Sequence, residues 1–211
     1  MREAGFTTFL VDDDPAVLRS ITRLLNAAGF KTKSFSSPQE FLSSHDPAIP
    51  GCAIIDLVMS ELDGLLLQQA LIDTGSDRPI IFLTGKGDIS TSVKAMKAGA
   101  VDFLTKPVQR EALFSAVKRA ANVDAESRQR RIESKSIGER ISTLTHRERE
   151  VLEYVIAGRL NKQIAASLGT VEKTVKVHRG RMMAKLGVRT VADLVRLADK
   201  AGIAPAHSMV G

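Results

Sequence analysis

Apolar positions follow two different patterns along this chain of 211 residues. Up to residue 121, short apolar runs alternate with longer segments in which apolar positions recur with helical spacing. Such an alternation is typical of a parallel sheet whose strands are joined by helices, so we expect an α/β domain with a doubly wound, five-stranded parallel sheet. The expected strands are Thr8–Val11, Lys31–Phe35, Ala53–Asp56, Ile80–Thr84 and Asp102–Thr105, and the expected helices are Pro15–Ala28, Pro38–Ser43, Gly64–Asp73, Ile89–Ala98 and Gln109–Ala121.

In the second part of the chain, apolar positions recur only with helical spacing. Residues 122–143 are polar and basic, with no proline and one glycine, which favours an extended or helical linker over a flexible one. From Leu144 on, glycines separate four helical segments, and Thr145 and Glu148 have the spacing of a capping box. We expect an all-α domain at residues 144–204 and a disordered tail at residues 205–211. The expected helices are Arg147–Ala157, Asn161–Leu168, Glu172–Leu186 and Val191–Ala201.

Composition excludes several classes of protein. Because Cys52 is the single cysteine, the chain can form neither an internal disulfide nor a cysteine-based zinc cluster, and we expect this residue in the core. Tryptophan is absent and aromatic residues make up 4% of the chain, which argues against a stacking platform for single-stranded nucleic acid. No apolar run reaches the ~18–20 residues of a membrane span. We expect a cytoplasmic protein without membrane contact.

Charge is distributed unevenly between the two parts. Residues 1–122 carry 13 Lys and Arg against 14 Asp and Glu, a net charge of −1. Residues 123–211 carry 17 against 10, a net charge of +7. A basic segment can be an ordinary solvated surface, but this one is the natural place to look for a polyanionic partner such as nucleic acid.

Polar residues collect where the predicted strands end, and in a doubly wound sheet these ends converge on one crevice. Clustered carboxylates repel one another unless a cation joins them, and their oxygen atoms suit Mg²⁺. A single aspartate at a strand end is usually only a loop cap, but that reading does not explain polar residues at several ends at once. With a hydroxyl and a lysine nearby, the set is equipped for phosphoryl transfer to an aspartate. It consists of Asp12, Asp13 and Asp14 after the first strand, Asp56 at the end of the third, Thr84 at the end of the fourth, and Lys106 and Pro107 after the fifth.

On these residues, positions 6 to 121 resemble the receiver domain of bacterial response regulators. The resemblance implies that Asp56 is the residue phosphorylated by a sensor histidine kinase. It also implies a site for Mg²⁺ formed by Asp12, Asp13, Asp56 and the backbone carbonyl of Val58.

The same resemblance assigns a switch to three further residues. Thr84 would bond one phosphoryl oxygen and Lys106 another, with the Lys106–Pro107 peptide bond commonly cis in the family. Phe103 holds the position of the aromatic side chain that turns inward when Thr84 moves. Because Phe103 lacks a hydroxyl, such a switch would act by packing alone.

Two loop residues depart from the family pattern. Ser60 stands where the family often has proline, so the loop after Asp56 is expected to be less rigid. Lys86 adds a positive charge near the pocket, where it would either attract phosphate or remain a solvated loop lysine.

A different phosphotransferase scheme is a weaker fit. Asp12 and Asp14, with Thr84 and Lys106, loosely resemble the haloacid-dehalogenase-type phosphatases, whose nucleophile ends the first strand. That scheme also requires an acidic pair after the lysine, which is missing here, and it leaves Asp56 without a role. Substitution of Asp12 or of Asp56 would separate the two schemes.

Residues 144–198 resemble the LuxR-type helix-turn-helix of the NarL/FixJ response regulators. The resemblance rests on Leu144-Thr145-x-Arg147-Glu148, Asn161 to Ala165, Thr174 to His178, and Lys185 to Val188. Within the segment 172–186, helical spacing places Val175, Met182 and Leu186 on one inward face. The other face is free to enter a major groove. The expected DNA-binding residues are Asn161, Lys162, Lys173, Thr174, Lys176, Val177, Arg179, Gly180 and Arg181, of which Lys176, Val177 and Gly180 match base-facing positions of the family.

This second resemblance also has departures. Gly180 offers no side chain to a base and costs the helix about 1 kcal/mol relative to alanine. Val171 stands where the family often has a capping serine, so we expect Thr170 to take over the cap. In the family the last helix, here Val191–Ala201, makes the dimer contact of the DNA-binding domain.

Together these patterns predict a DNA-binding transcriptional regulator, an activator by resemblance and not an enzyme. Its expected partners are a sensor histidine kinase, double-stranded DNA, RNA polymerase and, on phosphorylation, a second copy of the chain. The competing hypothesis is a constitutive docking module whose receiver is not phosphorylated. Such a module would not need Asp12, Asp13, Asp56, Thr84 and Lys106.

Overall fold

A computed structural model describes residues 5–60, 63–85 and 95–206 of the chain. The chain divides into two compact units, and the boundary between them in the sequence, Arg128 to Gln129, falls inside one long helix, α5. Each unit has its own apolar core, so each is described by itself.

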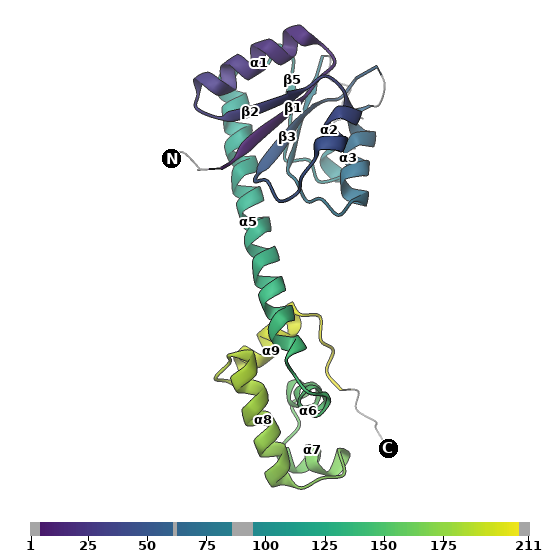
Figure 1. The fold of residues 1–211 in the computed structure, drawn as a ribbon, viewed down its shortest axis with the longest axis vertical. Coiled ribbons are helices and arrows are strands. Elements are labelled where there is room, and N and C mark those ends of the chain that lie inside the picture. The colour runs from purple at the N-terminus through teal and green to yellow at the C-terminus, as the bar shows by residue number, and fades with distance from the viewer. Residues whose placement is uncertain (1–4, 61–62, 86–94, 207–211) are drawn as a thin grey trace. The chain divides into compact units, whose positions relative to one another are not determined.

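The first unit is built on a five-stranded parallel sheet (Figure 1). The strand order is β2-β1-β3-β4-β5, with crossovers that are typical of a doubly wound fold. The five predicted strands are confirmed, with two of them beginning earlier than expected. They are β1 (Thr7–Val11), β2 (Lys31–Phe35), β3 (Gly51–Asp56), β4 (Ile80–Thr84) and β5 (Asp102–Thr105).

Helices cover both faces of this sheet, as its apolar strands require. Leu10, Ile54 and Leu83 pack with α1 and α5 on one face, and Phe9, Ile55 and Phe82 pack with α2 and α3 on the other. The expected helix Ile89–Ala98 lies largely outside the described residues, although residues 95–97 are helical. The helices of this unit are α1 (Pro15–Ala27), α2 (Pro38–Ser44), α3 (Gly64–Asp73) and the first part of α5 (Arg110–Ser142).

Local sequence explains where these helices begin and end. Asp14 caps α1 by accepting a hydrogen bond from the Ala16 N–H at 2.7 Å, and Pro15 occupies the first turn. After α1 the chain turns at Gly29, whose φ of 85° is costly for any residue with a side chain. Cys52 is fully buried in β3, as expected for a small core residue.

The helix α5 is much longer than the helix predicted at Gln109–Ala121. It continues to Ser142 and therefore runs through almost all of the expected linker, residues 122–143. Residues 129–136 are exposed on every side of the helix. With no buried face in this stretch, its residues show no apolar periodicity, and the sequence could not distinguish a helix from an extended connector.

The second unit is all-α, as predicted. The core contains Leu144, Val151, Ile164, Val175 and Met182, with a contribution from Ile137 near the end of α5. The predicted capping box is confirmed, because Thr145 and Glu148 bond each other's backbone at the start of α6. The helices after α5 are α6 (His146–Ile156), α7 (Asn161–Ser167), α8 (Glu172–Leu186) and α9 (Val191–Lys200).

No helix in the described part of the chain combines the length and the apolar character that crossing a membrane would require.

Candidate functional site

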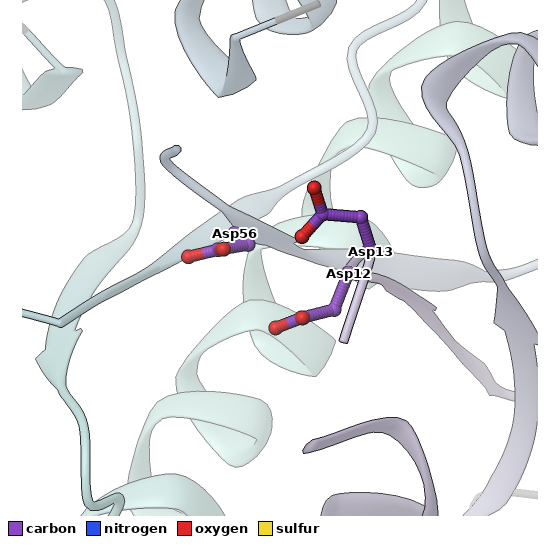
Figure 2. Close-up of side chains that lie close together, drawn as sticks. All are labelled: Asp12, Asp13 and Asp56. Carbon is purple, nitrogen blue, oxygen red and sulfur yellow. The ribbon is translucent and has the colours of Figure 1, made fainter. Parts of the chain in front are cut away.

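Three carboxylates meet at the carboxyl edge of the sheet. Asp12 and Asp13 follow β1 directly, and Asp56 is the last residue of β3. Because β1 and β3 are neighbouring parallel strands, with Val11 opposite Ile55, these side chains lie side by side (Figure 2). One oxygen atom from each residue lies within 4.8 Å of the other two.

The two aspartates after β1 have different surroundings. Asp12 is fully buried and accepts hydrogen bonds from the Asp14 N–H at 2.9 Å and from the Lys106 Nζ at 2.6 Å. Asp13 is exposed and accepts a bond from the Ser60 N–H at 2.8 Å. The sequence showed no sign of this Ser60 contact, which ties the loop after β3 to the acidic cluster.

Asp56 is nearly buried and lies 3.1 Å from the Nζ of Lys106. Desolvation raises the pKa of the Asp56 carboxyl above its ordinary value, and the positive charge of Lys106 opposes this rise. For Lys106 itself, burial lowers the pKa, but the hydrogen bond to Asp12 and the charge of Asp56 outweigh it and raise the pKa. Lys106 therefore stays a cation and partly neutralises two neighbouring carboxylates.

The remaining predicted residues of this site lie on the neighbouring strands and loops. Thr84 is buried at the end of β4, next to β3, and Phe103 is half-buried in β5, where it packs against the core. The side chain of Val58 is 73% exposed in the loop after Asp56. The Lys106–Pro107 peptide bond is cis, as the family resemblance implies. Lys86 lies outside the described residues.

The donor set fits a magnesium ion. Three carboxylates offer hard oxygen ligands within 4.8 Å of one another, which is what Mg²⁺ prefers in proteins. Among the described residues, Lys106 is the cation paired with this cluster, and its one positive charge does not balance three carboxylates. A bound divalent cation would favour the charged form of Asp56 and so oppose the desolvation that raises the pKa of this carboxyl.

The second unit carries a helix-turn-helix formed by α7 and α8. The prediction for the inward face of α8 is confirmed, because Val175, Met182 and Leu186 are all buried. The expected DNA-binding residues of α7 and α8 are all exposed or half-buried. Exposed are Lys162, Lys173, Lys176, Val177, Gly180 and Arg181, and half-buried are Asn161, Thr174 and Arg179.

Two of these residues contact each other. The Arg179 Nη1 donates a hydrogen bond to the Asn161 Oδ1 at 3.1 Å, which joins the start of α7 to the middle of α8. The sequence did not predict this pair, because the conformation of a long arginine side chain leaves no trace in a residue pattern. The contact fixes the position of one cation on the exposed face of the helix-turn-helix.

The expectation that Thr170 caps α8 is wrong. Val171 itself is the N-cap residue, and no side chain accepts a hydrogen bond from the first turn of the helix. Thr170 lies one residue outside the N-cap, where its hydroxyl is not in the capping position. Val171 is 64% exposed, so α8 begins with an apolar side chain on the surface.

Glu148 forms an ion pair that the motif alone did not reveal. It is buried at the start of α6 and accepts a 2.6 Å bond from the Nζ of Lys185 in α8. This bond, together with those from Thr145, lowers the pKa of the Glu148 carboxyl. The ion pair therefore links α6 to α8, the helix expected to read DNA.

Comparisons with known proteins agree with the two units. The family described as the response regulator receiver domain matches residues 8–118, and the family described as bacterial regulatory proteins of the LuxR type matches residues 142–198. The response regulator protein TodT of Pseudomonas putida is 40% identical over 200 residues, which are 95% of this chain and 88% of that protein. The transcriptional regulatory protein FixJ of Azorhizobium caulinodans is 38% identical over 197 residues, which are 93% of each chain.

Solved structures give the same picture. The response regulator StyR matches with a TM-score of 0.81 and 43% identity, over 93% of this chain and 100% of that chain. Full-length FixJ from B. japonicum matches with a TM-score of 0.56 and 36% identity, over 93% of this chain and 97% of that chain.

Proposed function

Because this chain belongs to the two-component response regulators that combine a receiver domain with a LuxR-type DNA-binding domain, we propose that phosphorylation of Asp56 switches its binding to DNA. The relatives are transcriptional regulators, and a receiver domain implies a histidine kinase as the phosphoryl donor. The observation that carries the proposal is the cluster at the edge of the sheet, where Asp56 adjoins two further carboxylates and Lys106.

Four groups are proposed to hold Mg²⁺: the carboxylates of Asp12, Asp13 and Asp56 and the backbone carbonyl of Val58. When bound, the ion would neutralise negative charge on the transferring phosphoryl group. Asp12 is already oriented by Lys106 and by the Asp14 N–H, and Asp13 by the Ser60 N–H. Such fixed ligands need little rearrangement to accept the metal.

In the proposed reaction an oxygen of Asp56 attacks phosphorus, the bond between phosphorus and the kinase histidine breaks, and an acyl phosphate forms. Lys106 lies 3.1 Å from the Asp56 carboxylate and can pair with a phosphoryl oxygen without leaving the site. The hydroxyl of Thr84, at the end of the neighbouring strand β4, is proposed to bond another phosphoryl oxygen. Movement of Thr84 would make room for Phe103 to turn inward from its half-buried position.

This movement is proposed to alter the face of the receiver formed by residues 89–98, 102–105 and 109–121 and to favour pairing of two receivers. A dimer brings two DNA-binding domains to adjacent half-sites and binds DNA more tightly than a monomer does. We propose that the resulting complex activates transcription through RNA polymerase.

On DNA, the recognition helix is proposed to be α8. Lys176, Val177 and Gly180 would face the bases, and Lys173 and Thr174 would lie beside them. The residues proposed to contact phosphates, which fixes the orientation of the domain without reading sequence, are Asn161, Lys162, Arg179 and Arg181. The pairing of Arg179 with Asn161 supports this role, because it holds both residues at the same edge of the helix-turn-helix.

These roles assign a function to each segment of the chain. We propose a receiver at residues 1–121, a helical linker at residues 122–143 and the DNA-binding domain at residues 144–204, with residues 205–211 as a tail.

The direct test is the site of phosphorylation. The purified chain, incubated with Mg²⁺ and a small phosphoryl donor such as acetyl phosphate, should gain the mass of one phosphoryl group. Asp56→Asn should abolish this gain, and removal of Mg²⁺ should prevent it. If Asp56→Asn were still phosphorylated and Asp12→Asn were not, the nucleophile would be the residue after β1 and the proposed switch would be wrong.

A further inference from the structure

The helix α1 lies beside the edge strand β2 (Figure 1). Residues of both elements line a groove. Its volume is about 360 Å³. The Oγ atoms of Thr22 and Ser34 lie 2.7 Å apart and connect its two walls, and the half-buried Leu18 packs on the core beneath it. The groove is lined by Leu18, Arg19, Thr22, Arg23, Asn26 and Ser34.

The charged residues in the segment that forms this groove are all cations. Residues 15–39 contain Arg19, Arg23, Lys31 and Lys33 but no aspartate or glutamate, although residues 1–122 as a whole have a net charge of −1. All four side chains are exposed. Among the described residues none of the four takes part in an ion pair. A concentration of four solvated cations without a counter-charge favours binding of an anionic partner.

The strand next to the groove has an unpaired edge. Among the described strands, β2 comes first in the sheet order and pairs with β1 alone. The N–H of Asp12 donates to the carbonyl of Phe35, so the backbone of Phe35 faces β1. Because successive residues of a strand alternate, the backbone groups of Thr32 and Ser34 face outward.

Cations flank this edge on both faces of the sheet. Ser34 points to α1, where Arg19 and Arg23 line the groove. Lys31 and Lys33 alternate with it and therefore share the opposite face with Phe35, which packs against α2 through Phe41.

We propose that the outer edge of β2 and the groove beside it bind an extended, acidic segment of a partner protein. Added as a further strand, the segment would use the outward backbone groups of Thr32 and Ser34. Its side chains would alternate between the two faces, so acidic residues at successive positions would meet Arg19 and Arg23 on one face and Lys31 and Lys33 on the other. Arginine suits this role because its guanidinium forms paired hydrogen bonds with a carboxylate.

Lysines on an edge strand also have a simpler role, which is to prevent sheets from pairing edge to edge. That role accounts for Lys31 and Lys33. It requires neither a pair of arginines on the adjacent helix nor a groove lined by hydrogen-bond donors. The arginine pair is therefore the feature to test.

The first experiment measures binding of a fluorescein-labelled, glutamate-rich peptide to the full chain by fluorescence anisotropy. Arg19→Glu with Arg23→Glu should weaken binding at least about tenfold, since two charge-assisted contacts are lost. Arg130→Glu with Lys135→Glu is the matched control, because it changes the net charge equally at exposed positions of α5 outside both the groove and the proposed pairing face. An equal loss in both double variants, or no loss in either, would overturn the proposal.

The second experiment locates the peptide by amide hydrogen exchange of the full chain. Saturating peptide should slow exchange at Thr32 and Ser34, whose N–H groups would gain partners, and the same peptide with glutamine in place of glutamate should not. Protection confined to residues 161–181 would show that the peptide binds the basic DNA-binding domain instead and would overturn the proposed site.

Discussion

At the scale of single residues, the chemistry at the edge of the sheet depends on how one lysine is shared between two carboxylates. Lys106 lies closer to Asp12 than to Asp56, at 2.6 Å against 3.1 Å. This arrangement leaves Asp56 less neutralised than Asp12, and its desolvated carboxyl has a raised pKa. We expect binding of a cation to depend on Asp12 as well as on Asp56, the proposed phosphoacceptor.

We expect Asp12→Asn to weaken binding of Mg²⁺ at least about tenfold, the scale on which loss of a metal's supporting groups acts. Isothermal titration calorimetry of the two proteins with Mg²⁺ measures this directly. Asp14→Asn is the matched control, since Asp14 caps α1 and asparagine can serve as a cap as well. Unchanged affinity in Asp12→Asn, or an equal loss in the control, would remove Asp12 from the metal site.

Stability of the second unit should depend on the protonation of Glu148. The bond from Lys185 lowers the pKa of Glu148 below its ordinary value of 4.5. A carboxyl with a depressed pKa in the folded state stabilises the fold fully above its unfolded pKa and loses this contribution as the pH falls through the folded pKa. Thermal melts between neutral pH and pH ~3 should therefore show a Tm that falls below about pH 4.5. The Tm of Glu148→Gln should be lower than that of the native protein at neutral pH and should fall less as the solution is acidified. If the Tm of Glu148→Gln depended on pH as the Tm of the native protein does, the role assigned to the pair of Glu148 and Lys185 would be contradicted.

Residue identities at the site could be predicted from sequence better than residue contacts. The parallel strands bring Asp12, Asp13 and Asp56 together by topology alone, so their positions in the sequence were sufficient. The bond between Asp13 and the Ser60 N–H and the pair of Arg179 with Asn161 depend on loop conformation and on side-chain torsions. Neither of these leaves a periodic signal.

At the scale of elements, α8, the proposed recognition helix, begins without a side-chain cap. Its N-cap residue, Val171, offers no acceptor to the first-turn N–H groups, and Gly180 weakens the middle of the helix. A Cβ atom on Gly180 would meet no heavy atom within 4 Å, so packing within the chain does not require a glycine there. Both residues reduce the intrinsic stability of the helix, whose position then rests on the buried face formed by Val175, Met182 and Leu186.

Restoring the cap should stabilise the DNA-binding unit. We expect Val171→Ser to raise its free energy of unfolding by about 0.5–1 kcal/mol, because the serine hydroxyl can accept a bond from the first turn. Val191→Ser is the matched control, because it also replaces an exposed valine with serine at the start of a helix. In α9 the side chain of Thr190 already caps the first turn, so a serine at position 191 should add no capping bond. Chemical denaturation of the full chain, followed at the transition of this unit, measures both. A rise of the same size in the control would mean that loss of exposed apolar surface, and not capping, is responsible.

The elements that sequence predicted best are those with a clear apolar signal, either a continuous apolar run such as the fully buried strand β4 or the one apolar face of α8. The strand Ile80–Thr84 and the helix α8 were predicted with the bounds that the structure gives. The continuation of α5 beyond residue 121 was missed as a single helix because residues 129–136 bury no face and therefore carry no periodicity. Its helical state is a property of local propensity and of the two ordered units on either side.

At the scale of the whole molecule, the charge distribution separates signal reception from DNA binding. Residues 1–122 have a net charge of −1 and residues 123–211 a net charge of +7, so attraction to DNA resides in the second part. An acyl phosphate on Asp56 would form in the first part. Control of DNA binding must therefore pass from one unit to the other, either by pairing of receivers or through the helix α5 that contains the boundary between them.

Control of DNA binding by phosphorylation of Asp56 can be tested by mapping DNA occupancy across the genome. The native protein and Asp56→Asn would be compared at matched expression, with Asp73→Asn as a control for loss of one exposed carboxylate. We expect discrete sites that are occupied by the native protein and by Asp73→Asn and lost in Asp56→Asn. Equal occupancy by the native protein and Asp56→Asn would contradict this control, because DNA binding would then follow protein level and not phosphorylation.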